Sequence, residues 1–291
     1  MFREQAFENA YQLVEHLSPL NRFQWGKSRY IYRGQPCSGF PLAPSALRTA
    51  GPMAAGSVMS EKLEYGERQV LFELQLLRAF IRACDAAGIP IPGDSEQLRN
   101  ELRGLKWELA FTRDERNWPP KVVHPVLATA QHHGVPTCLL DWTRRSYVAC
   151  YFAASAVMHT PAQSGSLAIW ALNREKLDDW GAVKLLEMPG ATSANLAAQD
   201  GVFTVSTLEA TMGGGLESTT VENLLAYDDT DEDPNPLLWK FTLPSSQAPE
   251  LLSLCADFGV KGSTLFPGYE GVAREIRDKA FAGELAEFFS T

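Results

Sequence analysis

The residues with the types and spacing to do chemistry are concentrated in one stretch, Gln131 to Thr143, which reads Gln-His-His-Gly-Val-Pro-Thr-Cys-Leu-Leu-Asp-Trp-Thr. It contains two of the chain's five histidines, and its glycine and proline favour a turn. Near neutral pH, His132 or His133 can act as a general base or as a hydrogen-bond donor, with Asp141 orienting the ring. Thr143 is expected to cap a helix that begins near residue 144.

Two other chemistries at this stretch are less favoured. Neighbouring side chains on a helix or strand point in different directions, so the adjacent histidines are poor geometry for one metal ion, and we expect no metal. Cys138 has no helix N-terminus directly after it to activate a thiolate. The five cysteines of the chain show no CxxC pair, which argues against a zinc ribbon or a disulfide framework.

Two further polar groups lie next to predicted strands. β-Formers alternate from Ser28 towards Arg33, and a glycine and a proline then break the element, so Arg33 is predicted at a strand end. Its five donors suit a phosphate or carboxylate ligand there, and they equally suit a carboxylate or carbonyl of the core. Asn195 and Gln199 form the second group, just before a predicted strand at 201–207.

The composition is that of a soluble globular protein, with 45% hydrophobic and 21% charged residues. We expect no membrane partner and a cytoplasmic location, because no stretch approaches the roughly 18 apolar residues of a membrane span and the N-terminus does not resemble a signal peptide. The net charge of −9 argues against general affinity for nucleic-acid backbones. Walker, GxGxxG, HExxH and GxSxG patterns are absent, which removes the commonest phosphate, dinucleotide, zinc-protease and hydrolase signatures.

Hydrophobic periodicity and breaker residues predict the elements that position these groups. The predicted helices cover residues 4–17, 61–87, 94–112, 122–130, 147–156, 246–258 (capped by Ser245 or Ser246) and 271–289. The predicted strands cover residues 28–33, 165–172, 201–207, 237–243 and 261–266. The helices at 61–87 and 94–112 are expected to form a hairpin that is scaffold, the small residues at 51–60 to be mobile, and the acidic run at 228–233 to be a solvated loop.

At these motifs the chain resembles the FRG domain family, named for its Phe/Tyr-Arg-Gly start. The resemblance covers roughly residues 28–278, and it is carried by five segments, Tyr32-Arg33-Gly34-Gln35, Gln131 to Thr143, Tyr151-Phe152-Ala153, Asn195 to Thr204 and Leu265 to Gly271. Three positions depart from the family pattern: Cys138 and Leu196 or Ala197 replace usual arginines, and Ser146-Tyr147 replaces a small residue plus proline. If those arginines grip an anionic ligand in the family, binding here is weaker or organised differently.

The resemblance implies a single FRG-type domain over residues 1–291. Within it we expect a first strand and loop at 28–57, a helical hairpin insertion at 58–116, a core with the sheet and main motifs at 117–278, and the end of a C-terminal helix at 279–291. Tyr32-Arg33-Gly34 is also similar to the strand end that opens the catalytic core of mono-ADP-ribosyltransferases. That analogy implies an α+β fold with a mixed, ADP-ribosyltransferase-like split sheet flanked by helices.

The same analogy implies NAD as the ligand. Arg33 would clamp a phosphate or a ribose hydroxyl, Gly34 would bind nicotinamide through its main chain, and Gln199 would replace the glutamate that stabilises the reacting ribose. The expected catalytic residues are therefore Arg33, His132 and Gln199, and the expected cofactor-binding residues are Tyr32, Gly34, Gln35, Gln131, His133, Asp141, Thr143 and Tyr151. An amide neither neutralises positive charge nor accepts a proton, so transfer should be slower than with glutamate.

Three functions fit these expectations. The first is an NAD-dependent ADP-ribosyltransferase-like enzyme that modifies a protein or nucleic acid, as a toxin or phage-defence effector. The second is a module that senses a nucleotide or another ligand without catalysis. The third is a hydrolase or nuclease that uses His132.

Overall fold

A seven-stranded mixed sheet forms the centre of the molecule in the computed structural model, which describes residues 2–21, 25, 29–48, 65–103, 118–158, 165–177, 182–188, 193–206, 220–225 and 235–284. The described strands are β1 (Arg3–Ala6), β2 (Tyr30–Gln35), β3 (Leu139–Thr143), β4 (Ser166–Asn173), β5 (Val183–Leu186), β6 (Gly201–Ser206) and β7 (Leu238–Pro244). Their order is β1-β7-β4-β2-β3-β6-β5, and every neighbouring pair is antiparallel except β1 with β7. The predicted α+β class is confirmed.

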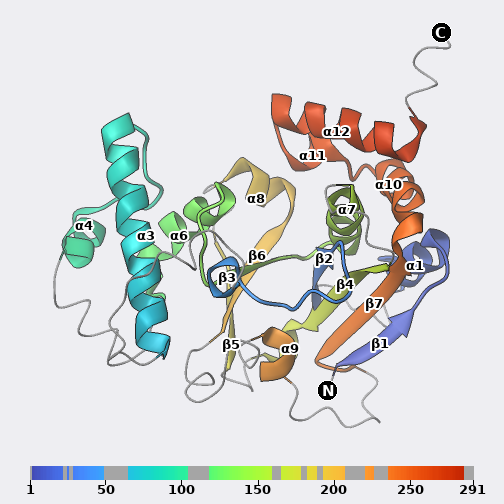
Figure 1. Ribbon diagram of the computed structural model, residues 1–291, viewed down its shortest axis with the longest axis horizontal. Coiled ribbons are helices and arrows are strands. Elements are labelled where there is room, and N and C mark those ends of the chain that lie inside the picture. The colour runs from blue at the N-terminus through green and yellow to red at the C-terminus, as the bar shows by residue number, and fades with distance from the viewer. Residues whose placement is uncertain are drawn as a thin grey trace.

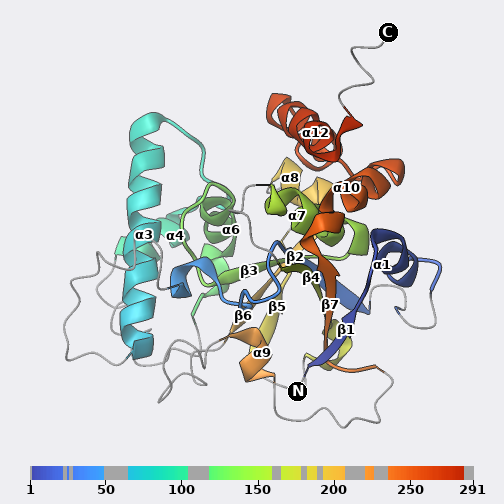
Figure 2. The same ribbon diagram turned by 45° about the vertical axis from the view of Figure 1, so that its right-hand side comes forward.

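Helices cover the sheet in two groups (Figure 1). The described α-helices are α1 (Ala10–His16), α3 (Tyr65–Ala87), α4 (Glu96–Arg103), α6 (His124–His132), α7 (Ser146–Val157), α8 (Ala194–Ala198), α9 (Val221–Leu224), α10 (Ala248–Asp257), α11 (Gly262–Leu265) and α12 (Tyr269–Ala282). α3, α4 and α6 stand beside β3 and β6, and α1, α7, α10 and α12 lie over the opposite half of the sheet, as Figure 2 shows from a second direction. None of the described helices is long and apolar enough to cross a membrane.

The two halves of the sheet meet at a narrow seam between β2 and β3. Six residues of β2 pair with β4 and five residues of β3 pair with β6, whereas β2 and β3 share only the pair Tyr32 with Thr143. Each half also has its own hydrophobic cluster on the helix-covered face. The sheet is therefore continuous but almost divided, and the space beyond the single pair is bounded by residues of both halves.

The half built on β2 is held by close packing of α7 against the strand. Gly34 lies against the backbone of α7, where an added methyl group would overlap the carbonyl oxygen of Ala149 and would stand 2.6 Å from the amide nitrogen of Ala153. The small, apolar residues of α7 were expected from the sequence to form a buried helix, and Ala149 and Ala153 are fully buried. A glycine at position 34 thus has a structural cause of its own, since only a missing side chain permits this approach.

The half built on β3 is held by the helical hairpin. The periodic residues of α3 are buried, namely Val70, Leu74, Leu77, Ile81 and Cys84, and the Ser95 hydroxyl caps α4 by accepting the Leu98 amide at 3.1 Å. A buried carboxylate, Glu73, accepts hydrogen bonds from the Trp118 indole at 3.2 Å and from the Cys138 amide at 3.0 Å. This contact connects the hairpin to the start of β3, so the two predicted helices are confirmed over their described residues and support the wall on which Asp141 lies.

The N-terminal helix predicted over 4–17 is shorter than expected. Residues 3–6 form β1, which pairs in parallel with the edge of β7, and the helix begins only at Ala10. The Asn9 side chain caps it by accepting the Gln12 amide at 3.0 Å. Pairing with a strand more than two hundred residues away decides the conformation of 3–6, and helical spacing cannot reveal such a partner.

The strand predicted over 261–266 is wrong, because residues 262–265 form α11. A capping interaction starts this turn, since the Lys261 amide donates to the Thr264 hydroxyl at 3.1 Å. Gly262 packs against α12, where an added methyl group would lie 2.7 Å from the Gly271 carbonyl oxygen. Close helix packing therefore explains Gly262, whose neighbours suggest a strand by composition alone.

Smaller differences concern element ends. α10 begins at Ala248 behind a 3₁₀ turn at Ser245–Gln247, and neither serine caps it. α12 begins at Tyr269 and ends before Gly283, whose φ of 82° is the left-handed conformation of a helix end. The edge strand β5 was not predicted. The segments at 51–60 and 228–233, and the part of the last predicted helix beyond residue 284, lie outside the described residues.

Candidate functional site

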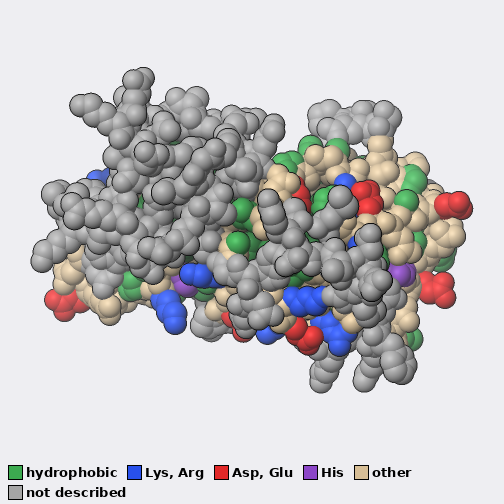
Figure 3. All heavy atoms as spheres, turned by 90° about the horizontal axis from the view of Figure 1, so that it is seen from below, with side chains coloured by type: hydrophobic (Ala, Val, Ile, Leu, Met, Phe, Trp, Pro, Cys, Tyr) green, Lys and Arg blue, Asp and Glu red, His purple; other side chains and the backbone are tan. Residues whose placement is uncertain are grey.

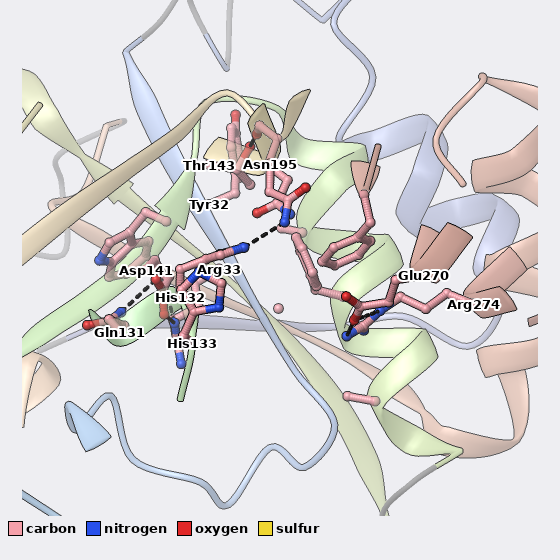
Figure 4. Close-up of a pocket in the computed structure, with 17 residues that line it drawn as sticks. Tyr32, Arg33, Gln131, His132, His133, Asp141, Thr143, Asn195, Glu270 and Arg274 are labelled. Carbon is pink, nitrogen blue, oxygen red and sulfur yellow. Dashed lines mark hydrogen bonds and ion pairs between the residues drawn. The ribbon is translucent and has the colours of Figure 1, made fainter. Parts of the chain in front are cut away.

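A cavity of about 540 Å³ opens at the seam between β2 and β3. Its walls come from β2, the end of α6, β3, α7, the α8 turn and the α11–α12 segment, which are far apart in the sequence. Figure 4 shows Arg33, Gln131, His132, His133 and Asp141 together on one side, with Glu270 and Arg274 across the cavity from them. The nearly divided sheet therefore places the polar stretch of residues 131–143 opposite the C-terminal helix.

Most of the residues expected from the sequence line this cavity. They are Tyr32, Arg33, Gly34, Gln131, His132, His133, Asp141, Thr143 and Gln199. Gln35 does not, because its 3%-exposed side chain accepts the Trp170 indole at 2.8 Å and donates to the Pro41 carbonyl at 3.1 Å on the other side of the sheet. Tyr151 lies apart from the cavity as well, with its hydroxyl donating to Asp278 at 2.6 Å.

A short chain of hydrogen bonds fixes the Asp141 carboxylate. The Thr137 hydroxyl donates to the Gln131 amide oxygen, and the Gln131 amide nitrogen donates to Asp141 Oδ1 at 2.6 Å. The turn predicted from the glycine and proline of this stretch brings these residues together between α6 and β3. Because the Asp141 side chain is 61% exposed, the result is an oriented carboxylate that faces the cavity.

Arg33 crosses the seam one residue beyond the single strand pair. Its Nη1 donates to the Asp141 carbonyl oxygen at 2.7 Å and lies 3.7 Å from the Asp141 carboxylate, and its side chain is only 16% exposed. Burial lowers the pKa of Arg33 while Asp141 opposes that shift, and a guanidinium stays charged in either case. Its Nε is buried without a hydrogen-bond partner among the described residues. A buried donor without an acceptor is costly, so this edge of Arg33 fits an acceptor atom of a bound ligand.

His132 is held as a neutral ring. Its Nε2 lies 2.6 Å from the amide nitrogen of Asn195, so the amide donates, Nε2 accepts and the ring proton is assigned to Nδ1. Burial lowers the pKa of His132, the neighbouring His133 lowers it further, and the carboxylates of Asp141 and Glu270 act against this. The geometry favours His132 as a hydrogen-bond donor through Nδ1 over His132 as a general base.

Thr143 and Gln199 join the two sides of the cavity. The Thr143 hydroxyl donates to the Gln199 carbonyl at 2.6 Å and accepts the Arg145 amide at 3.1 Å. α7 begins only at Ser146, so Thr143 stabilises the turn before the helix and is not its cap, which corrects the prediction. The Gln199 side chain donates to the Leu265 carbonyl at 3.1 Å. Its amide therefore has a structural partner in α11.

Phe152, Phe266, Glu270 and Arg274 are among the lining residues that were not expected from the sequence. Glu270 and Arg274 have the spacing of an ion pair on one helix face, which is usually only a solvated surface. That this face lies at the cavity depends on α11, which was predicted as a strand. Phe152 belongs to the motif Tyr151-Phe152-Ala153, in which the sequence predicts Tyr151 as the ligand-binding residue.

Cys138 points away from the cavity, into the core beneath the hairpin. Its side chain is buried, and burial together with the Glu73 carboxylate raises the pKa of its thiol well above the usual value. The thiol is therefore protonated and has no access to a ligand in the cavity. Position 138 faces the core beneath the hairpin and does not line the cavity.

Within the described parts of the chain, no group of three or more His, Cys, Asp or Glu side chains is arranged to hold a metal ion. Basic and acidic side chains are interspersed on the face of the molecule seen in Figure 3. The described side chains visible on this face form no broad patch of one sign for a polyanion.

We predict that the protein loses stability as the pH falls from about 7.5 to about 5.5. Burial lowers the pKa of His16, His124 and His132, so between those lowered values and about 6.5 the unfolded chain binds more protons than the folded one. The slope is at most about 1.4 kcal/mol per pH unit for each ring, and smaller here because water screens half-buried rings. Carboxylates with lowered pKa values, such as Glu275 at about 2, contribute only below about pH 4.5. Urea denaturation across this range measures the slope, and a midpoint that is constant or rises with acid contradicts it.

Comparison with known proteins gives a match to a family model. Residues 28–161, which include β2, the stretch 131–143 and α7, match the family model of the FRG domain. No curated protein and no solved structure matches the chain.

Proposed function

Because residues 28–161 form an FRG domain, whose arginine strand and histidine stretch meet at one cavity, we propose that this cavity binds NAD and that the protein is an ADP-ribosyltransferase-like enzyme. The observation that carries the proposal is Arg33, a charged side chain that lines the cavity and whose buried Nε has no hydrogen-bond partner among the described residues. A phosphate or ribose oxygen would satisfy it. The cavity of about 540 Å³ is within the range of sites for small molecules and cofactors.

The walls of the cavity fit the two ends of such a ligand. Residues 33–35 of β2 pair with β4 but have no partner on β3, so the side of the strand that faces the seam has backbone groups to offer to the nicotinamide amide. The rings of Phe152 and Phe266 supply aromatic surface at the cavity, with their centroids 5.9 Å apart. Nδ1 of His132 and the Asp141 carboxylate supply a donor and an acceptor for ribose hydroxyls.

In this proposal NAD supplies a glycosidic bond that breaks with the electron pair leaving on nicotinamide, while a nucleophile of the target bonds to the ribose carbon and loses its proton. The chain must then stabilise positive charge that develops at that carbon. Asp141 is suited to this role because its carboxylate is oriented by Gln131 and faces the cavity. Gln199 orders the wall through Leu265, so the chemistry does not depend on its amide.

A ligand-sensing module without catalysis is the second candidate. It is favoured by Gln199, since the amide that stands where the analogy expects a glutamate is engaged with a backbone carbonyl. The partner of the protein is a protein or nucleic acid in the cytoplasm. It would receive ADP-ribose from the enzyme, or respond to the ligand-bound state of the sensing module. If ADP-ribose is transferred to such a target, the protein acts as a toxin or a phage-defence effector.

Incubation of the purified protein with NAD and cell extract tests the proposal. We expect release of nicotinamide and transfer of labelled ADP-ribose to a macromolecule, both lost in Asp141→Asn, which keeps the shape of the side chain but removes its charge. Glu175→Gln, an exposed carboxylate that pairs with Arg29 away from the cavity, is the matched control and should retain activity. An NAD-dependent rise in melting temperature without turnover favours the sensing module instead. Cleavage of nucleic acid or esters that depends on His132 and ignores NAD contradicts both.

A further inference from the structure

Arg274 of α12 lines the cavity, although the sequence did not predict it as a site residue. Its guanidinium carbon lies 4.2 Å from the centroid of the Phe266 ring, which also lines the cavity. Its Nε and Nη2 both donate to one oxygen of Glu270, at 3.1 and 2.7 Å. The aromatic ring thus supports the cation from one side, and Glu270 occupies one edge of its fork of donors.

The two arginines of the cavity differ in how readily they change partners. Arg33 is 16% exposed and donates to a backbone carbonyl, which cannot move without the strand. Arg274 is 39% exposed and its partner Glu270 is 69% exposed, so their ion pair is a surface pair of the kind that contributes at most about 1 kcal/mol. An incoming anion can therefore displace Glu270 into water at little cost, whereas the partner of Arg33 stays in place.

The charges of the cavity indicate the kind of anion. Arg33 and Arg274 lie on opposite walls, each beside one carboxylate, Asp141 or Glu270 (Figure 4). These four side chains sum to zero, so the cavity holds no excess positive charge until a carboxylate leaves. When Glu270 swings out, a cation supported by an aromatic ring is exposed opposite Arg33, which suits phosphates that lie between the two arginines.

We infer that Arg274 binds the diphosphate of a dinucleotide in this cavity, and that Glu270 holds its guanidinium until the ligand replaces it. This inference rests on the proposed function, because it names the residue that grips the diphosphate of NAD. Glu270 is then an internal competitor of the ligand. Removing Glu270 should strengthen binding, whereas removing a carboxylate that contacts the ligand or supports the fold should not.

Isothermal titration calorimetry of the full chain with NAD, ADP-ribose and nicotinamide riboside tests the inference. We expect Arg274→Ala to weaken NAD and ADP-ribose about 10-fold or more, the magnitude of one charge-assisted contact, and to leave nicotinamide riboside, which has no phosphate, unchanged. Glu270→Gln should bind NAD several-fold more tightly than the wild type. Arg277→Ala makes the same charge change at an exposed position of α12 outside the cavity and should bind all three as the wild type does. Melting temperatures confirm that each variant is folded.

The outcomes separate this inference from the proposed function. If the wild type binds NAD and Arg274→Ala binds it equally well, or loses all three ligands to the same degree, the inference is overturned and the proposed function stands. Weaker NAD binding in Glu270→Gln overturns the exchange of partners, because Glu270 then helps to hold the ligand. If the wild type binds neither NAD nor ADP-ribose, the proposed function fails, and the inference fails with it.

Discussion

Replacement of Gly34 by alanine is expected to lower the free energy of unfolding by about 3 kcal/mol or more, the upper range for overpacking a tight interface. The new methyl group would overlap the Ala149 carbonyl oxygen and would lie 2.6 Å from the Ala153 amide nitrogen. Both are backbone atoms of α7, so neither moves without shifting the helix. Chemical denaturation followed by circular dichroism measures the loss, or the variant accumulates as insoluble protein.

Gly165→Ala is the matched control for this substitution. Nothing lies within 4 Å of a methyl group added at Gly165, an exposed residue before β4, so that variant should unfold like the wild type. Equal stability of the two variants would show that α7 can withdraw from β2, and that position 34 does not need a glycine for packing. The glycine would then require another cause, such as direct approach of a ligand to the strand.

Replacement of Arg33 by alanine is expected to lower kcat/KM for release of nicotinamide from NAD by about 100-fold or more, the scale of losing one preorganised donor in an active site. The substitution removes the unpaired Nε donor and the contact with the Asp141 carbonyl that closes the seam. Both the ligand and the position of Asp141 are affected. A continuous assay of nicotinamide release measures the change.

Arg33→Lys and Arg29→Ala separate the possible causes. Lysine keeps the charge but cannot present the donor fork, so it should restore the melting temperature more than the activity. Arg29 lies just before β2, outside the cavity, and pairs with Glu175, so its removal should leave activity intact. If Arg33→Ala turns over NAD like the wild type, Arg33 serves only as a connection between the half-sheets.

Much of the site could be predicted from the sequence because its residues lie in short, locally defined motifs. The strand ending at Arg33-Gly34, the turn within 131–143 and the buried helix α7 each follow from β-formers, breakers and small apolar residues. Their meeting at one cavity was expected from the resemblance to a family. Side-chain directions were less predictable, since Gln35 and Tyr151 belong to the same motifs but face other parts of the core.

The wall of the cavity formed by the α11–α12 segment could not be predicted, because it depends on contacts between residues of different elements. Residues 261–266 have the composition of a strand, but they form a helical turn that the Lys261–Thr264 cap starts and that packs closely against α12 at Gly262. If residues 262–265 are predicted as a strand, the sequence does not indicate that the face of α12 with Glu270 and Arg274 points towards the cavity. The helix predicted from residue 4 was wrong at its start for a similar reason. Residues 3–6 form β1, whose conformation depends on pairing with β7, more than two hundred residues further along the chain.

The pairing of β1 with β7 has a consequence for the synthesis of the protein. The first strand of the chain, Arg3–Ala6, can be completed only when Leu238–Pro244 has left the ribosome. Once Ser166–Asn173 has been made, β4 also lacks its neighbour β7, so the growing chain carries two open strand edges until β7 emerges. Contacts of such sequence separation form slowly and expose edges to aggregation. A chain interrupted before residue 238 would therefore lack the strand that joins β1 to β4 and would leave both of those edges open to aggregation.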